Sequence, residues 1–182
     1  MWLVIVCWTV FLLYWLYSAI GIKRTVERRR ASRGLWFRIL VIAVLLAILH
    51  LEPLRAIAYY RFENPVLNGI GVILCAIGVI FAIAARKRLG ANWGLPMEVK
   101  ENPELVTSGP YALVRHPIYT GVIFATFGSG LVGGLLWFVP FVVFCFFFAR
   151  SANVEEATLL KQFPDAYPAY QARTKWLIPF IW

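Results

Sequence analysis

Acidic residues, histidines and cysteines are all scarce in this chain. Its 182 residues include nine Asp and Glu against 18 Lys and Arg, two histidines and three cysteines. Cys7, Cys75 and Cys145 each lie inside an apolar run, with no CxxC pair and no metal-ligand spacing. Buried free cysteines usually act as small hydrophobes. We therefore expect neither a disulfide nor a metal site.

Polar residues are also too few for a soluble domain of this size. Hydrophobic residues make up 61% of the chain, against about 45–50% in typical soluble domains, and the mean hydropathy is +0.72. This composition predicts an integral membrane protein with one domain, residues 1–182. The net charge of +9 could indicate nucleic-acid binding. However, the basic residues border apolar runs and form no separate basic domain, so they indicate membrane topology and no nucleic-acid partner.

The first half of the chain, residues 1–88, predicts three transmembrane helices. Met1 to Ile22 is long enough to span a membrane, and it lacks a basic leader and a small-residue cleavage site, so we expect a retained helix. Lys23 to Arg38 is the most basic segment and predicts a cytoplasmic anchor. Leu35 to Leu51 and Val66 to Ala85 are the next two spans. Three small residues in the third span predict close helix packing: Gly69, Gly71 and Gly78.

The second half, residues 89–182, predicts a loop, a helical hairpin and a polar tail. Leu89 to Pro110 is too charged to span and too long for a tight turn, so we expect a loop over the functional site. Ile118 to Ala149 is apolar, and the glycines between Gly128 and Gly134 predict a turn that divides it into two helices. Pro140 predicts a kink in the second helix. The tail has helical spacing up to Phe163 and is then broken by two prolines, Pro164 and Pro168.

The distribution of charge predicts five spans, with the N-terminus outside. In this arrangement the cytoplasmic side receives most of the basic residues, and only Arg55 and Arg61 lie outside. Four spans would instead separate Glu155 and Glu156 from His116 across the membrane. We therefore expect an all-α protein whose functional site and C-terminus are cytoplasmic.

The stretch from Leu105 to Gly121, LVTSGPYALVRHPIYTG, carries the densest group of functional side chains. It holds His116 between Tyr111 and Tyr119. The preceding Gly-Pro pair predicts a turn, and Pro117 suits the first turn of a helix. A polar, basic and aromatic cluster therefore lies where an apolar helix begins.

This stretch resembles the isoprenylcysteine carboxyl methyltransferase family, which also includes phospholipid methyltransferases. The shared pattern is LVTSGPY from Leu105 and RHPIYTG from Arg115, followed by Glu155-Glu156 and three aromatic residues, Phe163, Tyr167 and Tyr170. The resemblance covers roughly the C-terminal half. It implies an S-adenosylmethionine-dependent methyltransferase whose lipid-like acceptor enters from the bilayer.

The resemblance also implies which residues contact the methyl donor. Such a site needs acceptors for the ribose hydroxyls or the amine, donors for the carboxylate, and aromatic walls that tolerate a cation. Carried over by position, and completed by the hydrogen-bonding groups of Arg115 and Glu156, the set is Pro103, Glu104, Leu105, Val106, Tyr111, Arg115, His116, Pro117, Ile118, Tyr119, Glu155 and Glu156.

For the acceptor, the resemblance favours the carboxylate of an isoprenylcysteine or a similar isoprenoid. A carboxylate is already ionised near neutral pH and needs no strong base. The family's substrate arginine stands one turn before the first glutamate, where this chain has Ser151. Its neighbour Arg150 is the candidate for holding the acceptor, and we expect Arg150 and Glu155 to be catalytic.

Three other functions fit parts of the pattern. Phospholipid N-methylation belongs to the same class but needs a base or a deprotonated amine. Membrane sterol reductases that use NADPH share a similar core, with Asn in place of Ile118 and an acid soon after the glycine, whereas here Val122 follows Gly121. The third is a non-catalytic membrane protein that retains the motif.

Overall fold

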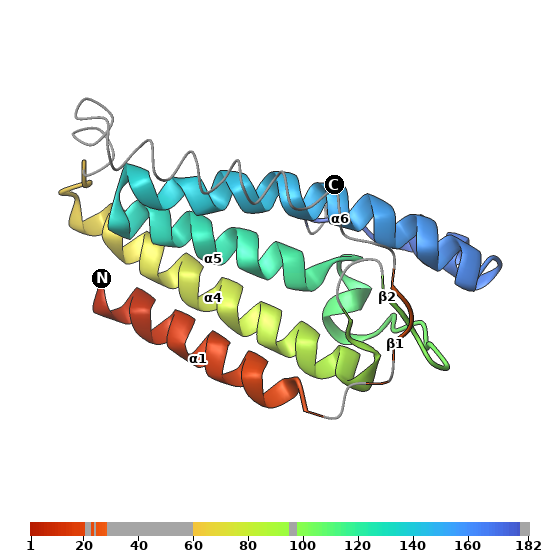
Figure 1. The fold of residues 1–182 in the computed structure, drawn as a ribbon. Coiled ribbons are helices and arrows are strands. Elements are labelled where there is room, and N and C mark those ends of the chain that lie inside the picture. The colour runs from red at the N-terminus through yellow and green to blue at the C-terminus, as the bar shows by residue number, and fades with distance from the viewer. Residues whose placement is uncertain (21–22, 24, 29–59, 95–97, 179–182) are drawn as a thin grey trace.

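The computed structural model describes residues 1–20, 23, 25–28, 60–94 and 98–178. Within these residues, four long helices pack side by side (Figure 1) in the order α1 (Trp2–Ser18), α4 (Pro65–Leu89), α5 (Pro117–Gly133) and α6 (Phe138–Gln162). The shorter elements are β1 (Thr25–Arg28), η1 (Gly90–Asn92), β2 (Glu98–Lys100), η2 (Gly109–Ala112), η3 (Leu135–Trp137) and α7 (Ala166–Arg173). The described part is helical, as predicted, apart from the short antiparallel pair β1–β2.

Much of the bundle surface is apolar. Pro65–Asn92 and Leu135–Gln162 are long enough and apolar enough to cross a membrane, and α1 and α5 are shorter apolar helices. Large apolar side chains point outward, with Trp2 81% and Phe146 70% exposed. Extended surfaces of this kind suit a lipid environment. The predicted span Leu35–Leu51 lies outside the described residues, so the count of five spans stays a prediction.

Helices α4 and α5 meet backbone to backbone at two glycine pairs. A Cβ atom on Gly78 would lie 2.5 Å from the carbonyl oxygen of Gly121, and one on Gly71 would lie 2.7 Å from that of Gly128. Such distances exclude any side chain and allow close contact. The packing role predicted for Gly71 and Gly78 is confirmed. Gly69 differs, because no atom lies within 4 Å of its Cβ position.

The predicted hairpin is present, but its turn lies at the end of the glycine-rich segment. Gly128 and Gly130 remain inside α5, and the chain reverses at Gly134, whose φ of 96° favours glycine. The predicted kink at Pro140 is wrong. Pro140 lies in the first turn of α6, where a helix has no internal hydrogen bond for proline to break.

The loop between α4 and α5, the β1–β2 pair and the C-terminal tail lie at one end of the bundle (Figure 1). There the C-terminal tail folds back on the start of α5: the Arg115 N–H donates to the Lys175 carbonyl at 2.8 Å, and the Thr120 hydroxyl donates to the Leu177 carbonyl at 2.6 Å. Pro164 follows α6 as expected. Pro168 does not break a helix, because it lies in the first turn of α7.

Candidate functional site

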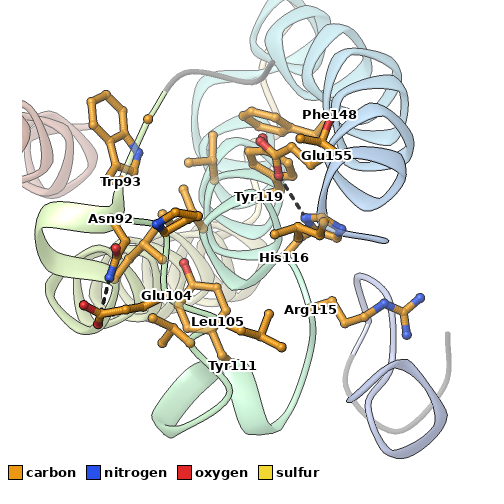
Figure 2. Close-up of a pocket in the computed structure, with 18 of the residues that line it drawn as sticks. Asn92, Trp93, Glu104, Leu105, Tyr111, Arg115, His116, Tyr119, Phe148 and Glu155 are labelled. Atoms are coloured by element: carbon orange, nitrogen blue, oxygen red, sulfur yellow. Dashed lines mark hydrogen bonds and ion pairs between the residues drawn. The ribbon is translucent and has the colours of Figure 1, made fainter. Parts of the chain in front are cut away.

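A cavity of about 530 Å³ opens at the polar end of the bundle (Figure 2). One wall is the loop around Pro103–Val106, and another is the start of α5 with His116 and Tyr119. Helices α1 and α6 supply apolar and aromatic walls, and Glu155 lies where the aromatic wall of α6 becomes polar. The cavity therefore joins a polar region near the loops to an apolar region between helices.

His116 is the centre of the polar region. It is the N-cap residue of α5, only 5% exposed, and its imidazole Nδ1 lies 3.3 Å from Glu155 Oε2. Its Nε2 lies 3.3 Å from Glu156 Oε1. Burial by itself would lower the pKa of His116, but hydrogen bonds to the two carboxylates and their negative charges outweigh it and raise that pKa. The protonated imidazole can donate to both glutamates at once.

An aromatic stack leads from His116 into the apolar region. The rings of His116 and Tyr119 are stacked with centroids 5.5 Å apart, Tyr119 stacks on Phe148 at 4.3 Å, and Phe148 on Phe144 at 5.2 Å. The Tyr119 hydroxyl donates a short hydrogen bond to Glu155. The His116 imidazole and the Tyr119 hydroxyl therefore both bind the Glu155 carboxylate, while Glu155 still lines the cavity.

Arg115 has a different role in the structure from His116. Its Nε donates to Glu156 Oε1 at 2.7 Å, and its Nη1 donates to the Thr174 carbonyl at 2.7 Å. Gln171 completes this group by donating to Glu156 Oε2 at 3.0 Å. In Figure 2 the guanidinium points away from the cavity, so Arg115 joins α5, α6 and the tail below the imidazole.

Tyr111 forms part of the opposite wall. It is 7% exposed, and the buried Tyr170 hydroxyl donates to its carbonyl at 2.7 Å. Burial, together with the charge of Glu155, raises the pKa of Tyr111, so its hydroxyl stays neutral and can donate. Tyr170 and its neighbour Tyr167 both line the cavity.

The loop wall around Pro103–Val106 is held in place by Lys23, which lies outside the loop. The Lys23 ammonium donates to Asn92 Oδ1 at 2.7 Å, to the Asn102 carbonyl at 2.9 Å and to Glu104 Oε1 at 3.1 Å. Asn92 and Glu104 line the cavity. The expectation that the polar loop lies over the site agrees with this geometry.

The structure brings most of the predicted donor-contact residues to one cavity. Pro117 and Glu156 are close by but are not among the lining residues, and Arg150 is exposed on α6, away from the lining. The predicted residues that do line the cavity are Pro103, Glu104, Leu105, Val106, Tyr111, Arg115, His116, Ile118, Tyr119 and Glu155.

Sequence reasoning missed the contribution of the first helix. Trp8, Phe11 and Trp15 of α1 line the cavity, and Trp15 packs edge-on against Trp93 with ring centroids 6.0 Å apart. Their spacing of three and four residues puts these aromatic side chains on one helix face, which is a signal that the sequence did contain. Tyr167 and Tyr170, which belong to the shared family pattern, pack against each other and line the site.

Comparisons with known proteins agree with this arrangement of fold and site. A family model described as phospholipid methyltransferase matches residues 66–166, which is more than half of the chain. The chain belongs to this family of membrane methyltransferases.

Several curated relatives carry a more specific name. The protein-S-isoprenylcysteine O-methyltransferase of Schizosaccharomyces pombe is 32% identical over 114 residues, which are 59% of this chain and 47% of that protein. The same enzyme of Tribolium castaneum is 29% identical over 119 residues, covering 63% and 42%. A relative with a different name, the cobalt-zinc-cadmium resistance protein CzcN of Cupriavidus metallidurans, is 27% identical over 164 residues. These are 87% of this chain and 69% of that protein.

A solved structure shares the fold. The eukaryotic intramembrane Ras methyltransferase ICMT superposes with a TM-score of 0.57 and 27% identity over 84% of this chain and 55% of that one. The chain thus spans less than half the length of the two isoprenylcysteine methyltransferases above and little more than half of this structure.

Proposed function

We propose that this protein transfers a methyl group from S-adenosylmethionine to a lipid-like acceptor in a membrane, and that the acceptor group is the carboxylate of an isoprenylcysteine or similar isoprenoid. The observation that carries this proposal is the convergence of His116 and Glu155, from two different helices, on one cavity. The names of the relatives support the same chemistry.

The residues of the cavity fit the donor. Its volume of about 530 Å³ lies within the usual range for small-molecule sites, about 300–1,000 Å³. Glu155 offers a carboxylate oxygen to hydroxyl or amine groups, and Tyr111 offers a neutral hydroxyl. The faces of Tyr119 and Phe148 tolerate a nearby cation. The irregular backbone of Pro103–Val106 offers N–H and carbonyl groups to a base.

The chain's part in the reaction is positioning and the exclusion of water. When bound, S-adenosylmethionine supplies an activated methyl group on a sulfonium. The Tyr119–Phe148 stack joins α5 to α6 and forms the wall that positions the sulfonium end of the donor. The apolar walls from α1 and α6 exclude water from the acceptor carboxylate. His116, hydrogen-bonded between two carboxylates, fixes the orientation of Glu155 and needs to exchange no proton with an acceptor that is already ionised.

The proposal includes a membrane arrangement. The chain forms a single membrane domain with five spans and an outside N-terminus, and the cavity mouth faces the cytoplasm, where the donor is available. The acceptor enters sideways from the bilayer, and Arg150, exposed on α6 about one and a half turns before Glu155, receives its carboxylate.

Two observations favour a second acceptor, a phospholipid amine. The family description names phospholipid methyltransferases, and Arg150 lies outside the described cavity lining. Glu155 and the aromatic rings that line the cavity suit an acceptor that carries an amine.

Two measurements test the proposal. Isothermal titration with S-adenosylhomocysteine should give saturable binding for the wild type and for the exposed control Lys161→Ala, but none for His116→Ala. A silent wild type would contradict the donor assignment. Purified protein, radiolabelled donor and either S-prenylated N-acetylcysteine or an aminophospholipid then identify the acceptor. Alkali releases the label from a methyl ester as methanol but leaves an N-methyl group intact.

A further inference from the structure

Lys23 lies outside the region that matches the family model, yet it holds the loop wall of the cavity. We propose that Lys23 is a positioning residue for donor binding, and that the segment after α1 thereby completes a site whose predicted donor-contact residues come from the second half of the chain. This inference rests on the proposed function, because the ligand of that wall is the methyl donor.

Three contacts account for all three N–H donors of the Lys23 ammonium group. They go to the side chain of Asn92 at 2.7 Å, the carbonyl of Asn102 at 2.9 Å and the carboxylate of Glu104 at 3.1 Å. The three acceptors come from the two ends of the loop, before and after β2. A single ammonium therefore closes the loop on itself.

The loop needs such a closure, because its return toward the cavity depends on an unusual conformation. Asn102 has a φ of 46°, the only positive φ outside glycine in the described residues. Asparagine tolerates this left-handed conformation better than most residues, but it remains uncommon. The turn at Asn102 sends Pro103–Val106 back along the cavity wall, and Lys23 binds the carbonyl of that same residue.

Glu104 is held on the Lys23 side. Its side chain is 73% exposed. The Oε1 atom accepts a hydrogen bond from the Lys23 ammonium, and Oε2 accepts one from Asn92 Nδ2 at 3.4 Å. The bonds from Lys23 and Asn92, followed by the Lys23 charge, lower the pKa of Glu104. Both carboxylate oxygens are thus engaged within the wall, and Figure 2 shows the bond from Asn92, so Glu104 supports the neighbouring backbone. Contact with the donor then falls to the backbone of Pro103–Val106.

A second attachment brings Lys23 to the loop. The Lys23 N–H donates to the Ala91 carbonyl at 3.1 Å, and β1 pairs with β2 through Thr25–Lys100 and Arg28–Glu98. The backbone pairing places the segment, and the ammonium then fixes the loop ends. Loss of the side chain alone should loosen the wall without removing the strand pair.

The test compares Lys23→Met with Lys87→Met, an exposed lysine on α4, as the matched control. Lys23→Met should weaken S-adenosylhomocysteine binding about threefold to tenfold, and raise the KM for S-adenosylmethionine with kcat unchanged, because Lys23 does not line the cavity. Lys23→Arg should restore most of the affinity. A double-mutant cycle with Glu104→Gln should be non-additive, because the two side chains act through one contact.

Amide hydrogen exchange of residues 101–106 separates this inference from the proposed function. Faster exchange in Lys23→Met than in Lys87→Met, together with weaker donor binding, supports the inference. Unchanged exchange, or faster exchange with unchanged affinity, overturns it. If the wild type binds no S-adenosylhomocysteine, the proposed function fails, and the assignment of Lys23 to donor binding fails with it. Exchange then still reports whether Lys23 holds the loop.

Discussion

His116 Nδ1 lies 3.3 Å from Glu155 Oε2, and this contact joins the start of α5 to the polar part of α6. The imidazole is almost fully buried, whereas the Glu155 side chain is 27% exposed. One end of the pair is therefore fixed in the protein, and the other remains available to a ligand in the cavity.

Removing the Glu155 charge should weaken donor binding strongly. A hydrogen bond to a charged group contributes about 1.5–3 kcal/mol, so Glu155→Gln should raise the Kd for S-adenosylhomocysteine about 10- to 100-fold. Glu101→Gln changes an exposed carboxylate of the loop and serves as the control. Equal affinities of the two variants, measured by titration calorimetry, would show that Glu155 does not contact the donor.

The raised pKa of His116 should appear in the pH dependence of stability. Its folded-state pKa lies above the ordinary value of 6.5, so protonation of the folded protein is favoured. The stabilisation is complete below about pH 6.5 and is lost as the pH rises through the folded-state pKa. The loss of stability in His116→Gln should therefore be larger at about pH 6 than at about pH 9. Thermal unfolding in detergent measures this difference, and Lys161→Ala should show no such trend.

The glycine contact between α4 and α5 should tolerate no side chain. Gly78→Leu places a Cβ atom 2.5 Å from the Gly121 carbonyl oxygen and should destabilise the bundle by about 1–3 kcal/mol or more. Gly69→Leu is the control on the same helix, where the space is open, and it should be neutral or slightly stabilising. If chemical denaturation gives both variants the same stability, the helices do not pack as described.

Arg115 should anchor the tail and leave the donor contacts largely in place. Arg115→Met removes the bonds to Glu156 and to the Thr174 carbonyl, which should cost about 1.5–3 kcal/mol and speed amide exchange in residues 174–177. Lys175→Met, an exposed position in the same tail, is the control. Slow exchange in both variants would indicate that other contacts hold the tail.

Arg150 should affect the acceptor and not the donor. Its side chain is exposed and outside the cavity lining, so Arg150→Ala should leave the Kd for S-adenosylhomocysteine within about twofold. If the acceptor is a carboxylate, the KM for S-prenylated N-acetylcysteine should rise about tenfold or more. An unchanged KM would remove Arg150 from the acceptor site and favour the amine alternative.

Local signals in the sequence predicted much of the described fold. Runs of apolar residues predicted α4 and the α5–α6 hairpin, and helical spacing up to Phe163 predicted the polar end of α6. Pro140 misled the prediction because the glycine-rich turn did not fix the residue at which α6 begins. Because the helix begins at Phe138, the proline lies in its first turn, where it breaks no internal hydrogen bond.

The long-range contacts were harder to foresee. Nothing in the local pattern says that Lys23 pairs with the loop or that Tyr170 binds the carbonyl of Tyr111. Both contacts join segments far apart in the chain, and each depends on how the loop and tail fold over the end of the bundle.

By itself, the sequence determined that this chain is an apolar helical protein with a conspicuous cluster around His116, because hydropathy and motif spacing are properties of neighbouring residues. Only the tertiary structure decided which groups meet: Glu155 beside His116, α1 as a wall of the cavity, Arg115 turned toward the tail and Lys23 at the loop. The physical reason is that these contacts depend on the approach of whole helices, which the Gly78–Gly121 contact sets for α4 and α5 and which no single segment encodes.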